Sequence, residues 1–210
     1  MHRAAYLDAA AIAADLLDQP AVADRWREPS ALPEFAVSGL AGHLGRQLTQ
    51  VVDVLAGDAT GRATVPLAEH YGRSAWLGKD VDEPVNVTIR TQGEESAAGG
   101  PAALRETVRA ALDALRAALP AEPADRAVLL PWTGWALTLD DFLVTRMMEI
   151  AVHSDDLAVS VGVPTPAFPE PVLGPVLALL TDLAVRRHGQ TAVLRALSRR
   201  ERAPQTITAL

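Results

Sequence analysis

One segment constrains this chain more than any other, residues 142–161, which read FLVTRMMEIAVHSDDLAVSV. On a helix, at about 100° per residue, its apolar side chains cover most of the circumference. A helix of that kind is largely buried. Its polar side chains fall in one stripe about 80° wide, which faces either solvent or an internal site: Arg146, Glu149, His153 and Asp156.

The rest of the chain also favours helices. Hydrophobic residues make up 49% of it and are mostly Ala, Leu and Val rather than aromatic, a composition more typical of helices than of sheets. Residues 85–98 are compatible with helix or strand, 128–135 with an extended segment, and 58–83 give no clear assignment. Several helices of bundle length with modest loops predict an antiparallel bundle: 6–17, 38–56 capped by Ser38 and closed by Gly57, 101–119, 138–161 opened by a capping box of Thr138 and Asp141, 171–188 and 193–202.

Charge and composition exclude several classes of protein. The net charge of −7 argues against a broad nucleic-acid-binding face, which requires a basic surface. The absence of cysteine excludes disulfides, cysteine zinc fingers and a cysteine nucleophile. Aspartates interrupt the apolar pattern of the N-terminal segment, unlike a signal peptide, and no run of about 18 uncharged apolar residues suggests a membrane span. We therefore expect a cytoplasmic protein.

Glu149 and His153 are four residues apart, so their side chains leave adjacent turns of one helix face and can reach one ion. A tight first-row metal site needs a third ligand, and His43 is the best candidate because Gly42 and Gly45 leave room around it. Spacing alone also fits a solvent-facing Glu/His pair. The other histidines have weaker contexts, namely a chain terminus, an unassigned segment and a cationic helix end: His2, His70 and His188.

Two segments carry a resemblance to a known family: GHL at 42–44 and RMMEIAVHSDDL at 146–157. Together with residues 131–134 and 198–202, they resemble the mycothiol-dependent maleylpyruvate isomerase family of the DinB-like superfamily. The resemblance implies an all-α fold, a DinB-like antiparallel four-helix bundle with additional short helices, in a single domain over residues 1–210. The isomerases carry an additional C-terminal domain, which we do not expect here. The resemblance also implies that zinc is bound by His43, Glu149 and His153.

Two histidines and one carboxylate leave an open position on zinc, as in catalytic rather than structural sites. The same ligands also accept nickel, iron or manganese. Such a centre can activate water for hydrolysis or stabilise an external thiol as its thiolate. The resemblance favours the thiol route, with mycothiol as co-substrate attacking a small electrophile in an S-transfer or an isomerisation.

Other polar and aromatic residues have two readings each. Asp156 either supports the site, by orienting a ligand or bonding Arg146, or forms an ion pair on the helix surface. Trp132 and Trp135 either line the electrophile pocket or are buried core aromatics. The basic C-terminal cluster either contacts the thiol's carboxylate or sugar groups or is a solvated helix end: Arg199, Arg200 and Arg202.

Two alternative functions remain open. One is a DinB-like metal-binding stress or biosynthetic protein without thiol-dependent turnover, and the other is a metal-dependent hydrolase. Saturable consumption of a thiol together with an electrophile would distinguish the thiol-dependent enzyme from both alternatives. An exposed face of the bundle is compatible with a homodimer.

Overall fold

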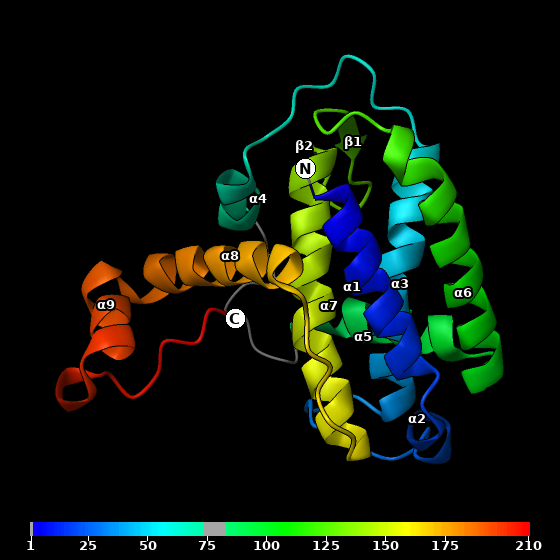
Figure 1. The fold of residues 1–210 in the computed structure, drawn as a ribbon, viewed down its shortest axis with the longest axis horizontal. Helices are drawn as coiled ribbons and strands as arrows, with labels where there is room; N and C mark the ends of the chain where they lie inside the picture. Colours follow the sequence, from blue (N-terminus) through cyan, green and yellow to red (C-terminus); the bar gives the residue numbers. More distant parts are fainter. Residues whose placement is uncertain (1, 74–82) are drawn as a thin grey trace.

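A computed structural model describes residues 2–73 and 83–210 of the chain. Four long helices in this part form a bundle (Figure 1): α1 (Arg3–Leu17), α3 (Val37–Ala56), α6 (Gly100–Ala118) and α7 (Leu139–Val161). Helices α1 and α7 run in one direction, and α3 and α6 run in the other. Contacts join α1 to the other three helices, and α3 to α6 and α7. The expected all-α fold is confirmed.

Helix α7 lies in the interior of this bundle, as its apolar circumference predicts. Its Leu143, Met147, Ile150 and Leu157 are fully buried against residues of α1 and α3 that belong to the same hydrophobic core. Burial on that scale is the main source of stability for a helix whose neighbours supply equally apolar faces. The polar stripe is therefore the face of α7 that is available to form a functional site.

Local sequence signals set both ends of α7. The Thr138 hydroxyl accepts a hydrogen bond of 3.1 Å from the main-chain N–H of Asp141, so Thr138 is the predicted N-cap. Gly162 ends the helix in the left-handed conformation, with φ of 72°, which glycine adopts without steric cost. These predicted boundaries are confirmed.

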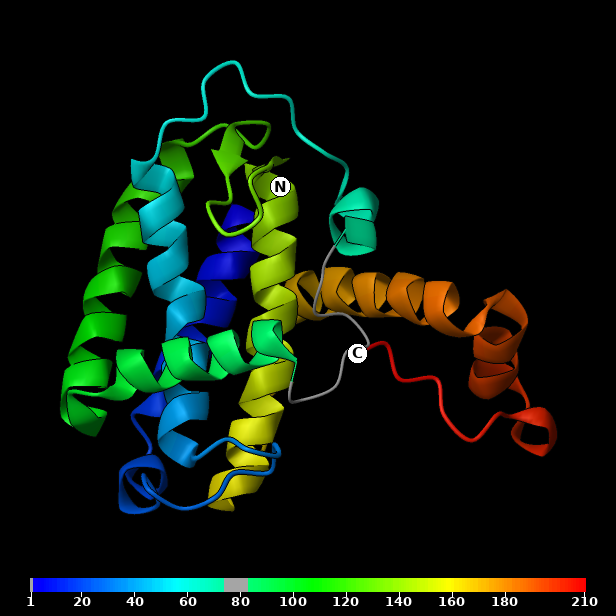
Figure 2. The same cartoon turned by 180° about the vertical axis from the view of Figure 1, so that it is seen from behind.

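The segment 85–98, which the sequence left open between helix and strand, is helical up to Ala97. Its helical part belongs to α5 (Pro84–Ala97), which crosses α3 (Figure 2). Glycines make the crossing close, because a Cβ on Gly42 would lie 2.0 Å from the main-chain oxygen of Gly93, and one on Gly93 would lie 2.5 Å from that of Gly39. Packing of α5 against α3, rather than local propensity, therefore accounts for the helical state of this β-branched segment.

Two expectations need correction or refinement. Helix α3 begins at Val37 with Ala36 as its N-cap and no side-chain capping bond, so the prediction that Ser38 caps it is wrong. The extended segment expected at 128–135 contains part of strand β1 (Ala127–Leu129) and the turn of a small antiparallel hairpin, whose second strand β2 (Ala136–Thr138) follows it. The unassigned region contains α4 (Leu67–Arg73), and its residues 74–82 lie outside the described part.

The remaining elements extend the bundle. Short helices α2 (Pro20–Asp24) and η1 (Leu119–Ala121) follow α1 and α6. Helix α8 (Glu170–His188) contacts α7 and α1 and then projects away from the bundle, carrying the final helices α9 (Gln190–Ser198) and η2 (Arg200–Arg202) (Figure 1). No helix in the described residues is long and apolar enough to cross a membrane.

Candidate metal centre

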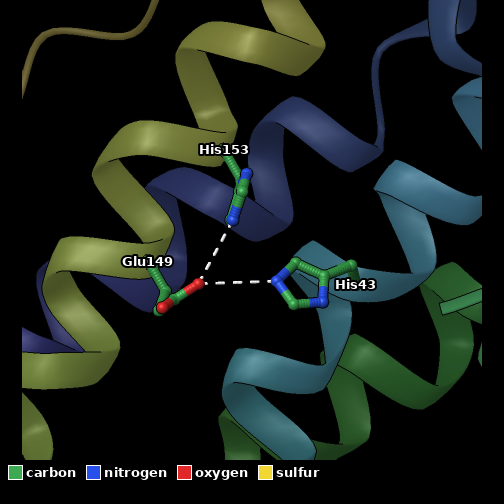
Figure 3. A group of neighbouring side chains, drawn as sticks. All are labelled: His43, Glu149 and His153. Carbon is green, nitrogen blue, oxygen red and sulfur yellow. Dashed lines mark hydrogen bonds and ion pairs between the residues drawn. The ribbon is translucent and has the colours of Figure 1, made fainter. Parts of the chain in front are cut away.

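The packing of α3 against α7 brings the three predicted ligands together (Figure 3). His43 comes from α3, and Glu149 and His153 come from adjacent turns of α7. Each offers one ligand atom, and these atoms all lie within 4.8 Å of one another. The Nε2 atoms of His153 and His43 lie 3.2 Å and 3.4 Å from the same oxygen, Oε2 of Glu149. With 13–19% of each side chain exposed, this cluster is mostly buried but reachable, unlike a surface ion pair.

Asp156 fixes the orientation of His153. Its Oδ2 lies 3.0 Å from Nδ1 of His153, so the Nδ1–H donates to this carboxylate and Nε2 faces Glu149. Burial opposes protonation of His153, but the hydrogen bonds to Asp156 and Glu149 outweigh it and raise the pKa of His153 to about 9. A carboxylate behind a ligating histidine is a recurrent arrangement in metal sites. The structure places Asp156 against His153 rather than Arg146, and its role in orienting a ligand stays a prediction.

His43 and Glu149 are in the protonation states that a metal requires. Burial lowers the pKa of His43, more than its contact with Glu149 raises it, so the ring is neutral with one lone pair available. Burial of Glu149 favours its neutral form, yet hydrogen bonds from His153 and His43 hold its pKa well below the usual range. The cluster therefore offers the carboxylate of Glu149 and the neutral imidazole of His43, beside the imidazole of His153.

The hydrogen bonds of His43 fit a cation better than they fit the metal-free cluster. Its Nδ1 is buried and has no hydrogen-bond partner among the described residues, while its Nε2 faces both Oε2 of Glu149 and the Gln47 amide nitrogen at 3.4 Å. A protonated Nε2 meets the amide hydrogens, and an unprotonated Nε2 faces a carboxylate lone pair. A divalent cation would accept both the lone pair of His43 Nε2 and that of Glu149 Oε2, with the ring proton of His43 on Nδ1. The donor set, with two imidazoles and one carboxylate, suits zinc.

A polar network behind His43 was not predicted from the sequence. Gln47 is 1% exposed, and its Oε1 accepts a hydrogen bond of 2.6 Å from Arg146. Arg146 also donates to Oε1 of Gln50 at 3.0 Å and lies over the Phe142 ring. Arg146 therefore joins the site, as expected from its place in the polar stripe, but it bonds the two glutamines rather than Asp156.

A third histidine, near the site but outside the cluster, was also missed. His70 of α4 is 6% exposed, and its Nδ1 accepts a hydrogen bond of 3.1 Å from Nε1 of Trp135, which places the ring proton on Nε2. Burial and the positive charge of Arg146 lower the pKa of His70 to about 4, against the opposing charge of Glu149. No helical periodicity marks His70 in the sequence, because α4 is only seven residues long.

The other candidate residues are not joined to the three ligands. Trp132 is 50% exposed, so the expectation of a buried core aromatic is wrong for it, whereas Trp135 is partly buried and bonds His70. The three arginines of the basic cluster are exposed and lie at the far end of the α8–α9 projection, away from α3 and α7 (Figure 1): Arg199, Arg200 and Arg202.

Comparison with known protein families agrees with this geometry. The mycothiol maleylpyruvate isomerase N-terminal domain family matches residues 6–158. The chain belongs to this family. The match extends from α1 through most of α7 and includes His43, Glu149 and His153, whereas α8 and α9 lie outside it. No curated protein and no solved structure matched the chain.

Membership of the mycothiol maleylpyruvate isomerase N-terminal domain family connects the site to thiol chemistry. The chain has no cysteine of its own. The three candidate ligands face one another inside the part of the chain that defines the family.

Proposed function

We propose that this protein is a zinc-dependent enzyme that activates mycothiol for attack on a small electrophile, as an S-transferase or isomerase. The observation that carries the proposal is the convergence of His43, Glu149 and His153 within 4.8 Å, in a chain of the mycothiol maleylpyruvate isomerase N-terminal domain family. Two imidazoles and one carboxylate are the ligand set of zinc sites that keep a position open for a reactant.

The ligands have distinct roles in this proposal. His43 and His153 would bind zinc through Nε2 and Glu149 through Oε2, and the bound ion supplies a Lewis acid that lowers the pKa of a coordinated thiol. Asp156 holds the Nδ1–H of His153 at 3.0 Å and so keeps Nε2 turned inward. The buried walls formed by α3 and α7 limit the access of water to the reacting sulfur.

The reaction begins when the thiol proton passes to solvent and the sulfur forms a bond to an electrophilic carbon. With an activated carbon–carbon double bond, the displaced electron pair moves onto the electron-withdrawing group. Rotation about the former double bond and expulsion of the same sulfur give an isomer and return the thiol. Protonation of the carbon instead gives an S-conjugate. The two outcomes differ in whether thiol is consumed, and this difference can be measured.

Metal content tests the site before any substrate is known. We expect about one zinc per chain in the purified, tag-free protein. His43→Gln and His153→Gln should each lose it, while His188→Gln should retain it, because His188 bonds the main-chain oxygen of Thr208 and lies on the projecting helix α8. Metal retained in both ligand variants, or a wild type that fails to bind added zinc, would contradict the proposal.

Thiol dependence tests the reaction. The zinc-loaded protein is incubated with mycothiol and a panel of activated alkenes, epoxides and alkyl halides, and both free thiol and product are measured. Saturable thiol-dependent turnover that disappears in His153→Gln supports the proposed enzyme. Zinc binding with thiol-independent hydrolysis would instead support a hydrolase, and zinc binding without turnover would support a metal-binding protein of another role.

A further inference from the structure

We propose that Gln47 provides a hydrogen-bond donor to an anionic ligand atom, such as a thiolate sulfur, at the metal centre, and that Arg146 fixes the direction of this donor. The inference rests on the proposed metal site and adds a residue that selects the charge of what binds there. Gln47 lies one turn after His43 on α3, and only 1% of it is exposed.

Two neighbours determine which end of the Gln47 amide faces the site. Arg146 can only donate hydrogen bonds, and it lies 2.6 Å from one end of the amide, so this end is the oxygen Oε1. The main-chain oxygen of His43 can only accept, and it lies 2.9 Å from the other end, which is therefore Nε2. A flipped amide would place its NH₂ group against the guanidinium of Arg146 and its oxygen against the main-chain oxygen of His43.

The Gln47 backbone is held equally firmly. The buried Tyr6 hydroxyl of α1 donates a hydrogen bond of 2.9 Å to the main-chain oxygen of Gln47. Gln47 is therefore fixed by three helices, through Tyr6 from α1, its own backbone in α3 and Arg146 from α7. A buried amide with both ends satisfied loses little further freedom when it binds a ligand atom.

The two hydrogens of Gln47 Nε2 have different partners. One donates to the main-chain oxygen of His43, at 2.9 Å, and the other points to Nε2 of the His43 ring, at 3.4 Å. A metal bound through His43 Nε2 uses the lone pair that the second hydrogen would otherwise approach. That hydrogen then has no acceptor in the ring and is available to a ligand atom that binds the metal beside His43.

A buried donor without an acceptor is unfavourable, so this hydrogen favours a ligand atom with negative charge over a neutral one. A thiolate sulfur is such an atom. Arg146 reinforces this preference from the far side of the amide. Its positive charge draws electron density toward Oε1 and makes the N–H hydrogens of Gln47 more positive. Gln47 thus makes the centre selective for anions without binding the metal itself.

Gln50 provides a matched control for this role. It accepts a hydrogen bond of 3.0 Å from the same Arg146 nitrogen, and it lies one turn further along α3. In the described structure no hydrogen bond joins Gln50 to His43. Substitution of Gln50 therefore perturbs Arg146 without removing the donor beside His43.

The experiment uses the full chain loaded with Co²⁺, whose visible absorption reports each ligand that binds. Wild type, Gln47→Met, Gln47→Glu and Gln50→Met are titrated with two anionic probes, azide and 2-mercaptoethanol, which loses its proton to buffer and binds as the thiolate, and with imidazole as a neutral probe. Cobalt affinity is measured in parallel by calorimetry. We expect both Gln47 variants to bind the two anionic probes about 10- to 100-fold more weakly, the loss typical of one hydrogen bond to a charged group.

Imidazole and cobalt affinities should change less than about threefold in Gln47→Met, a fraction of one such hydrogen bond, and Gln50→Met should resemble wild type. Anion affinities unchanged in Gln47→Met, or reduced equally by Gln50→Met, would overturn the inference. Loss of cobalt from both Gln47 variants would also overturn it, since Gln47 would then act by holding His43. A wild type that binds no cobalt would overturn the proposed metal site itself.

Discussion

His153 lies between two carboxylates, and this position explains why Asp156 belongs to the site although it cannot reach the other ligands. Glu149 faces the Nε2 of the ring at 3.2 Å, and Asp156 faces Nδ1 at 3.0 Å. In the neutral ring that a metal requires, the bond to Asp156 keeps the proton on Nδ1 and so directs the Nε2 lone pair at the cluster. At the scale of single residues, ligand orientation therefore depends on a residue that does not bind the metal.

The substitution Asp156→Asn tests this orientation. The amide can present its NH₂ group rather than an acceptor to His153, so the ring loses its fixed tautomer, and we expect zinc affinity to fall about 10- to 100-fold. Competition titration with a zinc-binding dye measures the change. Asp155→Asn is the control, because Asp155 is exposed and bonds Thr165 instead. Equal zinc affinities in wild type and Asp156→Asn would contradict the role of Asp156.

His70 links the site to the stability of the metal-free protein at acid pH. Its pKa of about 4 in the folded state lies below the value of about 6.5 for an unfolded histidine. The unfolded chain therefore binds more protons between these values. The contribution of His70 is fully present above about pH 6.5 and is lost as the pH falls toward 4, by up to about 3 kcal/mol.

We expect the variant His70→Gln to show a weaker loss of stability between pH 6.5 and 4 than wild type does. Urea denaturation of both metal-free proteins at several pH values measures the difference. The groups that act on His70 include Arg146, Glu149 and the rings of Tyr71 and Trp135, and the substitution leaves these four in place. Parallel pH profiles for the two proteins would show that His70 does not titrate in this way.

At the scale of elements, the crossing of α5 over α3 supports the site from behind. Gly42 immediately precedes His43, and its α-carbon faces the main-chain oxygen of Gly93 on α5. Only glycine allows the two helices to approach this closely. The position of α5 therefore affects the part of α3 that carries His43, although α5 itself contributes none of the three ligands.

The substitution Gly42→Ala tests the close crossing. Its new methyl group would lie 2.0 Å from the Gly93 oxygen, so the helices must separate, and we expect the free energy of unfolding to fall by about 1–3 kcal/mol or more. Gly174→Ala is the control, since its nearest neighbour is the flexible Glu170 carboxylate, and the gain in helix propensity is worth up to about 1 kcal/mol. Chemical denaturation of both variants measures these changes, and an undiminished stability of Gly42→Ala would contradict the contact.

At the scale of the whole molecule, the proposed ion would join the two oppositely directed helices α3 and α7. Ligand residues from both helices come together only in the folded chain, so a metal that binds them adds its binding free energy to folding. The α8–α9 projection lies outside the family match and does not supply any of the three ligands. We therefore expect metal binding to stabilise mainly the bundle.

We expect zinc at 100 times its dissociation constant to stabilise the folded chain by about 2.7 kcal/mol. For a chain of this size, such a gain raises Tm by about 5–10 °C. Thermal unfolding followed by circular dichroism, with zinc or with a chelator, measures the shift. His153→Gln serves as the control and should show no comparable shift. An equal rise in Tm in that variant would place the stabilising ion elsewhere.

The sequence alone determined those features that depend on neighbours along the chain. The burial of α7 follows from its apolar circumference, and its ends follow from Thr138 and Gly162. The pairing of Glu149 with His153 follows from helical periodicity. His43 was selected by its surroundings and by the family resemblance. Local hydrogen bonds and periodicity carry this information because they act within one or two helical turns.

Only the tertiary structure decided which groups meet across elements. The helical state of α5 depends on its contact with α3, because its own β-branched residues are also compatible with a strand. Asp156 bonds His153 rather than Arg146. Gln47 is held by Tyr6 of α1 and Arg146 of α7, and His70 is held by Trp135. The physical reason is that these partners are distant in sequence, so their hydrogen bonds and burial exist only after the helices have packed.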